Sequence, residues 1–237
     1  MPNNYFKFKQ FTIQQENCAM KVCTDACLFG AWVADQVKTK AATNILDIGT
    51  GTGLLSLMLA QRVPAMIDAV EIDEAAYLQA KENFEQSPWK ERLGIFNTNI
   101  LKFDVEKKYD CIISNPPFFE NDLKSTDKNK NAAKHDTALT LEQLLPTVQK
   151  LLKDDGSFAV LIPYHRVEEC ILLAEKFGLQ LSKKVLVKQT PKHEYFRGIL
   201  IFSCTKKNML TEEITIKNES NIYTERFSEL LKDYYLY

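Results

Sequence analysis

The chain lacks an excess of charge of either sign. Its 237 residues include 30 Lys or Arg and 31 Asp or Glu, which gives a formal net charge of −1. A strongly basic domain would point directly to nucleic acid, and this composition does not. Because 45% of the residues are hydrophobic and 26% are charged, the composition is that of an ordinary globular protein and not of a disordered or fibrous one.

Long hydrophobic runs are also lacking. No stretch approaches the roughly 18 consecutive apolar residues that a membrane-spanning helix needs. Residues 1–9 contain no apolar core of the kind found in a signal peptide. We therefore expect a cytoplasmic protein without a membrane partner.

Paired cysteines are absent as well. The six cysteines are scattered, and none forms the C-x-x-C pair that is typical of a zinc site. Cys18, Cys23 and Cys27 lie close together in sequence, but no His lies nearby to complete a tetrahedral set of ligands. The sequence therefore predicts reduced cysteines and no metal site.

Short apolar runs alternate along the chain with stretches of helical spacing. Such alternation predicts right-handed crossovers, a mostly parallel sheet and helices on both of its faces. No internal repeat and no Pro-, Gly- or Ser-rich linker divides the chain, so we expect one domain, 1–237. The expected strands are 44–48, 67–72, 93–97, 109–114, 157–162, 181–188 and 199–204, and the expected helices are 26–37, 54–62, 74–86, 141–153 and 167–177.

A glycine-rich turn follows the first of these strands. Gly49, Gly51 and Gly53 stand between the strand and the next helix, where glycines permit a tight turn and the close approach of a ligand. In open α/β sheets a nucleotide-bearing ligand binds at this edge. The spacing is G-x-G-x-G, which differs from the dinucleotide fingerprint G-x-G-x-x-G.

Two acidic residues accompany this turn. Asp47 stands two positions before the first glycine, where it suits a ligand that carries positive charge. Glu71 ends the second strand and can accept hydrogen bonds from both hydroxyls of a ribose. The alternative is that both carboxylates only cap loops. Together with the glycines, they predict a site for S-adenosylmethionine.

The fourth strand ends in an Asn-Pro-Pro-Phe sequence, residues 115–118. Pro116 and Pro117 force the chain out of the sheet in a stiff, extended conformation. Asn115 would then present fixed oxygen acceptors to an exocyclic amine, and Phe118 a face on which a base can stack. The alternative is an ordinary Asn-Pro turn with a buried Phe. We assign residues 115–118 to catalysis.

These motifs resemble those of a known family. D-x-G-x-G-x-G at 47–53, the acid after the second strand and N-P-P-F look like a class I S-adenosylmethionine-dependent amino methyltransferase. With residues 19–32, 133–136 and 227–235, the whole chain more closely resembles the bacterial valine-tRNA adenosine-37 N6-methyltransferases. The resemblance implies a Rossmann-like, seven-stranded sheet whose last strand is antiparallel.

The resemblance also implies roles for parts of the chain. The N-terminal segment 1–40 would close over the cofactor, ahead of a core at 41–205 and a tail at 206–237. Thr24 and Asp25 would lie near the methionine end of the cofactor, although they could equally cap the helix that follows. Asn99 stands where the family often has an acid that binds the cofactor's adenine.

Contacts to RNA are expected in two polar segments. From Lys183 to Lys207 there are seven Lys or Arg and one acid, and this stretch contains three of our candidates, Lys192, His193 and Arg197. The fourth candidate, His135, lies in a loop of 22 residues between Pro117 and Thr140, and loops of this length are usually functional or disordered. A solvated face is the alternative for both segments.

The resemblance therefore implies an enzyme that methylates the N6 amine of adenosine 37 in the anticodon loop of a valine tRNA, and we expect it to act as a monomer. The alternatives are another RNA, a glutamine amide in a protein, or a partner module that binds the cofactor without catalysis. Only about 40 residues precede the first expected strand, which argues against the N-terminal helical domain typical of glutamine methyltransferases.

Overall fold

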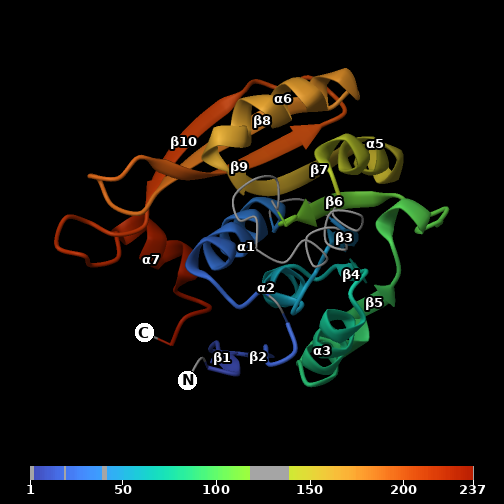
Figure 1. Cartoon of the computed structure of the whole chain (residues 1–237), viewed down its shortest axis with the longest axis horizontal. Helices are drawn as coiled ribbons and strands as arrows, with labels where there is room; N and C mark the ends of the chain where they lie inside the picture. Colours follow the sequence, from blue (N-terminus) through green and yellow to red (C-terminus); the bar gives the residue numbers. More distant parts are fainter. Residues whose placement is uncertain (1–2, 19, 39–41, 118–138, 237) are drawn as a thin grey trace, which may run out of the picture.

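A mostly parallel sheet forms the centre of the computed structural model, which describes residues 3–18, 20–38, 42–117 and 139–236 (Figure 1). In this part of the chain, eight strands pair in the order β10-β8-β9-β7-β6-β3-β4-β5, and β1 and β2 form a separate hairpin. The strands are β1 (Tyr5–Lys7), β2 (Thr12–Gln14), β3 (Asn44–Ile48), β4 (Met66–Glu71), β5 (Leu93–Asn97), β6 (Tyr109–Ser114), β7 (Leu152–Pro163), β8 (Gln180–Lys188), β9 (Tyr195–Ser203) and β10 (Leu210–Thr215).

The topology confirms the expected Rossmann-like fold with one correction. Strand β9, the last of the seven expected strands, is antiparallel to both β7 and β8, as expected. An eighth strand, β10, pairs in parallel with β8 and comes from the segment expected to be a tail. Its sequence signal is weak because only Ile214 is buried and two of its six residues are glutamates, which are depleted in strands.

Helices cover both faces of the sheet. Successive residues of β3 point to opposite sides, so that Ile45 belongs to one hydrophobic core and Leu46 to the other. The first face is covered by α1 (Thr24–Val37), α2 (Leu54–Arg62), α3 (Glu74–Glu85) and α7 (Glu225–Leu231), and the second by α5 (Leu141–Leu151) and α6 (Val167–Lys176). Short 3₁₀ turns occur at η1 (Lys90–Arg92), η2 (Ile100–Lys102) and η3 (Tyr164–Arg166).

Most expected boundaries are confirmed, and the largest shift concerns the segment before β7. The helix expected at 141–153 ends at Leu151, and the strand expected at 157–162 begins at Leu152. The intervening Asp-Asp-Gly, which predicts a turn, is accommodated where the pairing of β6 with β7 shifts register between Tyr109 and Cys111.

The two ends of the described chain pack against each other. The backbone N–H of Lys9 donates to the carbonyl of Tyr234 at 2.8 Å, and the rings of Phe8 and Tyr235 lie 6.1 Å apart. The Tyr234 hydroxyl donates to the carbonyl of Met58 in α2 at 3.0 Å. Figure 1 shows the hairpin beside the C-terminal end. The hairpin is therefore fixed by residues that follow the whole sheet in sequence.

No helix in the described ranges is both long and apolar enough to cross a bilayer.

Arg92 provides a test of how α2 is held. Its guanidinium donates to the carbonyls of Ala60, Val63 and Ala65 at 2.8–2.9 Å, at the end of the helix. Arg92→Met leaves these carbonyls without their donor, so we expect the free energy of unfolding to fall by about 1.5–3 kcal/mol, measured by urea titration. Lys81→Met, at a side chain about half exposed, is the control and should change it little. Equal effects of the two substitutions would contradict this role.

Candidate active site

Two neighbouring cavities open at the carboxyl ends of the parallel strands. The first, the glycine-loop cavity, has a volume of about 250 Å³ and is lined by Gly49, Gly51, the ends of β4, β5 and β6, and Cys18 and Met20 from the N-terminal segment. The second, the β9 cavity, has a volume of about 530 Å³ and is lined by the ends of β6 and β7, the start of β9 and the start of α1.

The glycine loop presents its backbone to the first cavity. Gly49 and Gly51 have φ angles of 71° and 56°, in the left-handed region that favours glycine. A Cβ atom built on either residue has no atom of the described residues within 4 Å, so a ligand can approach the peptide groups directly. The third glycine differs, because a Cβ on Gly53 would lie 2.5 Å from the ring of Phe84. Gly53 lines neither cavity and allows α3 to pack against the start of α2.

Asp47 organises the loop from beneath. Its side chain is fully buried and lines neither cavity, and its Oδ2 accepts hydrogen bonds from the hydroxyls of Thr50 at 2.6 Å and Ser56 at 2.7 Å. Its Oδ1 is buried without a hydrogen-bond partner among the described residues. Burial raises the pKa of Asp47 to about 6, against the opposing effect of the two hydroxyls.

Glu71 fixes the loop from the neighbouring strand. Its Oε2 accepts a hydrogen bond from the Gly51 N–H at 2.9 Å, and its Oε1 accepts from the N–H groups of Ile72 and Asp73. The carboxylate lines the glycine-loop cavity and is 8% exposed. Asn99, at the end of β5, lines the same cavity, with its Oδ1 accepting from the Leu101 N–H at 2.9 Å.

The two cavities share one wall. Asn115, Pro116 and Pro117 line both of them, and so does Met20. The end of β6 is held in place by the Ser114 hydroxyl, which donates to the carbonyl of Ile48 at 2.8 Å. The sequence prediction that the Asn-Pro-Pro motif leaves the sheet beside the glycine loop is thus confirmed in position. Phe118 lies outside the described residues.

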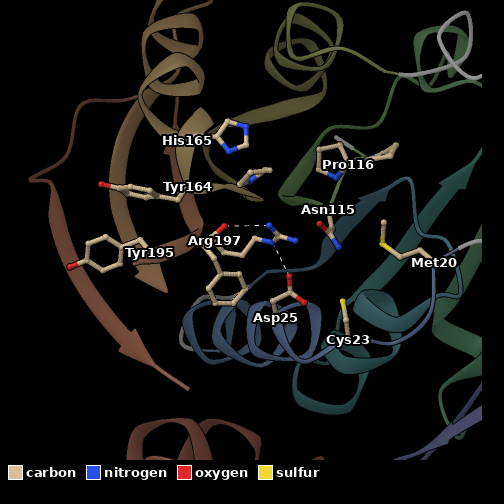
Figure 2. A pocket seen from close by; sticks show the side chains of 12 residues that line it. Met20, Cys23, Asp25, Asn115, Pro116, Tyr164, His165, Tyr195 and Arg197 are labelled. Carbon is tan, nitrogen blue, oxygen red and sulfur yellow. Dashed lines mark hydrogen bonds and ion pairs between the residues drawn. The ribbon is translucent and has the colours of Figure 1, made fainter. Parts of the chain in front are cut away.

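An ion pair joins α1 to β9 across the second cavity. The Arg197 Nε donates to the Asp25 carboxylate at 2.8 Å, and its Nη1 donates to the carbonyl of Phe196 at 3.3 Å (Figure 2). Asp25 and Arg197 both line the β9 cavity, whereas Thr24, the first residue of α1, lines neither. The structure therefore brings together two residues that were predicted separately, one for the cofactor and one for RNA.

A buried amide connects the glycine loop to the N-terminal segment. The Asn83 Nδ2 donates to the carbonyls of Thr52 and Gln14, and its Oδ1 accepts from the Gln14 N–H at 2.8 Å. The next residue, Gln15, accepts from the Val22 N–H through its own Oε1, also at 2.8 Å. The segment that contributes Cys18 and Met20 to the cavities is therefore anchored to α3 and to the loop.

Comparisons with known proteins agree with this architecture. The family model for the methyltransferase small domain matches residues 30–185. The chain is 42% identical to the tRNA1(Val) (adenine(37)-N6)-methyltransferase of Phocaeicola vulgatus, with 100% of this chain and 99% of that one covered. The chain belongs to this methyltransferase family. Its counterpart in Dyadobacter fermentans is 46% identical over the same shares of the two chains.

A solved structure supports the fold of the methyltransferase. A predicted O-methyltransferase from Agrobacterium tumefaciens superposes with a TM-score of 0.68 and 15% identity, over 90% of this chain and 98% of that one. At this identity the likeness concerns the fold alone.

The thiols beside the site stay protonated at neutral pH. Burial, with Glu71 and Asp73 nearby, raises the pKa of Cys18 to about 11. Burial and Asp25 raise the pKa of Cys23 to about 12. Neither thiol is therefore suited to act as a nucleophile. Within the described ranges, no three His, Cys, Asp or Glu side chains gather in a way that could hold a metal ion.

Two of the other residues expected to contact RNA lie away from the cavities of the methyltransferase. Lys192 and His193 are exposed in the turn before β9 and line neither cavity, and the His193 Nδ1 lies 2.7 Å from the Thr190 hydroxyl. His135 lies outside the described residues. The positive charge of the stretch from Lys183 to Lys207 is partly neutralised by nearby acids. Lys184 on β8 pairs with Glu168 at 3.5 Å, and β8 lies beside the acidic strand β10.

Sequence reasoning missed several residues of the site. Met20, Tyr164 and His165 line the β9 cavity, and Cys18 lines the glycine-loop cavity. Cys18, Tyr164 and His165 belong to no local motif, and Met20 lies in the stretch 19–32 that supports the resemblance but was given no role. Asn83 reaches the loop only because α3 packs against it. Tyr164 and His165 could have been predicted from Pro163, which marks the end of a strand. In this fold the residues that follow the carboxyl ends of the strands face the site.

Asn83 allows the anchoring to be tested. Asn83→Ala removes the donor to Thr52 and both bonds to Gln14, so we expect unfolding to cost about 1–3 kcal/mol less and the affinity for S-adenosylmethionine, the expected cofactor, to fall. The dissociation constant is measured by calorimetry well below the melting temperature. Gln86→Ala, which removes an exposed side-chain bond on the same helix, is the control. An unchanged dissociation constant for Asn83→Ala would contradict the coupling.

The buried carboxyl of Asp47 gives a pH dependence. Its pKa of about 6 exceeds its ordinary value of 3.8, so the folded state binds the proton more tightly than the unfolded state. This contribution to stability is complete below about pH 4 and is lost as the pH rises through about 6. Relative to Asp47→Asn, the ligand-free wild type should lose about 2–3 kcal/mol between about pH 4 and pH 7, measured by urea unfolding. A constant difference over that range would refute this.

Proposed function

We propose that this enzyme transfers a methyl group from S-adenosylmethionine to the N6 amine of adenosine 37 in the anticodon loop of a valine tRNA. The activity for which its relatives are named and the Asn-Pro-Pro motif support this proposal. A tRNA substrate would place the enzyme in the cytoplasm, as the sequence predicts. We also propose, from the sequence prediction, that the enzyme acts as a monomer.

The glycine-loop cavity fits S-adenosylmethionine chemically. Gly49 and Gly51 leave the backbone open to a ligand, and the Glu71 carboxylate is positioned for a ribose. Apolar side chains from β3 and β4 and the amide of Asn99 are suited to an adenine ring. When bound, this cofactor supplies a methyl group on a positively charged sulfur. The Asp47 carboxylate lies behind the glycine loop and would not touch the cofactor. Its negative charge would favour the positively charged sulfur electrostatically, across the backbone of the loop.

The observation that carries the proposal is that Asn115 lines both cavities. The lone pair of an adenine amine is delocalised into the ring, so the amine is a poor nucleophile until hydrogen bonds hold and pyramidalise it. The Asn115 side-chain oxygen and the Pro116 carbonyl are acceptors of the required kind at the boundary between the cavities. Positioning of this kind supplies a large part of the rate enhancement in reactions of two substrates.

The target base enters the β9 cavity unstacked. The volume of the β9 cavity, about 530 Å³, accommodates a nucleobase and part of the attached ribose. A single-stranded loop presents such a base at lower cost than a duplex does. The amine proton leaves to water after the transfer, so no side chain needs to act as a general base.

Asn115→Ala tests the role of the shared wall. The substitution removes one acceptor from the amine, so the single-turnover rate of methyl transfer should fall by at least about 100-fold. The dissociation constant of S-adenosylmethionine should stay within about twofold, because the Glu71 and glycine contacts remain. Parallel losses of rate and cofactor affinity would instead make Asn115 a structural residue.

The acceptor is tested by transfer of a radiolabelled methyl group into total tRNA, with DNA and protein as parallel acceptors. We expect label in tRNA, at an N6-methyladenosine that nuclease mapping places at position 37 of a valine tRNA. Label only in protein would favour glutamine methylation. Label at another RNA position would change the substrate, and cofactor binding without transfer to any acceptor would indicate a non-catalytic module.

A further inference from the structure

A pair of tyrosines lines the β9 cavity on the side away from the shared wall. Tyr164 stands in the turn η3 directly after β7, and Tyr195 begins β9. Their ring centroids are 5.2 Å apart with an angle of 48° between the planes. Figure 2 shows the two rings on one side of the cavity and Asn115 and Met20 on the other, with Arg197 between them.

The two rings differ in how firmly they are held. The Nζ of Lys188, on the neighbouring strand β8, lies 4.3 Å from the centroid of the Tyr195 ring. Tyr195 is therefore held against the neighbouring strand β8. Tyr164 is 41% exposed, and its turn is braced by the Arg166 guanidinium, which donates two hydrogen bonds to Glu169. An aromatic face is thus presented at the mouth of the cavity on a rigid support.

Lone exposed aromatic residues are common on protein surfaces and need no ligand. Tyr164 differs from such residues in two ways. It lines the cavity that Asn115 also lines, and its ring packs against the ring of Tyr195, over which the Lys188 ammonium lies. The exposed imidazole of His165 lies next to Tyr164 in the chain and lines the same cavity. Aromatic faces combined with cations are typical of sites for single-stranded nucleic acid.

We propose that Tyr164, supported by Tyr195, stacks on a nucleotide adjacent to the target adenosine and so holds the RNA strand while the target base occupies the β9 cavity. This proposal rests on the proposed function. The Tyr164 ring provides the stacking surface, and Lys188 and His165 lie where they can approach the phosphates beside it. Stacking on a ring is tolerant of sequence, so this contact positions the strand and does not select one base.

The test uses full-length enzyme and an anticodon stem-loop in which 2-aminopurine replaces the nucleotide on either side of the target adenosine. Stacking quenches 2-aminopurine fluorescence, so the wild type should quench one of the two probes on binding. Tyr164→Ala should abolish this quenching and raise the KM for RNA by about 5- to 100-fold, whereas kcat and the affinity for S-adenosylmethionine change little. Tyr164→Phe retains the ring and should behave like the wild type.

Tyr5→Ala is the matched control, because Tyr5 is a 52% exposed tyrosine on the N-terminal hairpin. It should leave quenching and KM unchanged. If the wild type methylates the stem-loop but Tyr164→Ala leaves both the KM and the quenching unaltered, the stacking proposal alone is overturned. An equal loss in Tyr164→Phe would also overturn it. A wild type that neither binds nor methylates the RNA would overturn the proposed function and this inference together.

Discussion

The hydrogen bond from the Gly51 N–H to the Glu71 carboxylate links the ends of the first two parallel strands of the core. Because Gly51 has a left-handed backbone, its peptide N–H can point back to β4 while its Cα side stays open to a ligand. Two further contacts complete the support of the loop: Asp47 holds Thr50 and Ser56 from below, and Asn83 holds the Thr52 carbonyl from the side. The loop is therefore preorganised before any ligand binds, which reduces the entropy lost on binding.

This support lowers stability, because a fully buried carboxylate is costly when one of its oxygens has no hydrogen-bond partner in the described part of the chain. Such a group is typical of functional sites, where charge is retained although burial opposes it. Its place two residues before the first glycine puts negative charge under a loop that is expected to bind a cationic cofactor. The interaction between the Asp47 carboxylate and such a cofactor would cross a short stretch of buried protein, so salt would screen it little.

Much of the fold and part of the site could be predicted from the sequence. The helix at 54–62 and the fourth strand at 109–114 were predicted with the bounds observed, because their apolar patterns are strong and their boundaries are local. The eighth strand was not, since the pairing of Leu210–Thr215 with β8 depends on the neighbouring strand and not on its own pattern. Local motifs indicated positions 49, 71 and 115, which line the glycine-loop cavity, and position 47, which lines neither cavity and holds the loop through Thr50 and Ser56. Asn83 and Tyr164 were missed because their roles arise only from contacts between distant segments.

The contact between Lys9 and Tyr234 also constrains when the site can assemble during synthesis. The hairpin precedes the sheet in the chain, but the residues against which it packs follow every strand of the sheet. The segment bearing Cys18 and Met20 can bind α3 through Gln14 and Asn83 once that helix has formed, but the hairpin before it gains its contact with Tyr234 only after the whole sheet has been made. In a nascent chain that has completed the sheet but not the residues after it, this wall of the glycine-loop cavity is therefore attached on the α3 side alone.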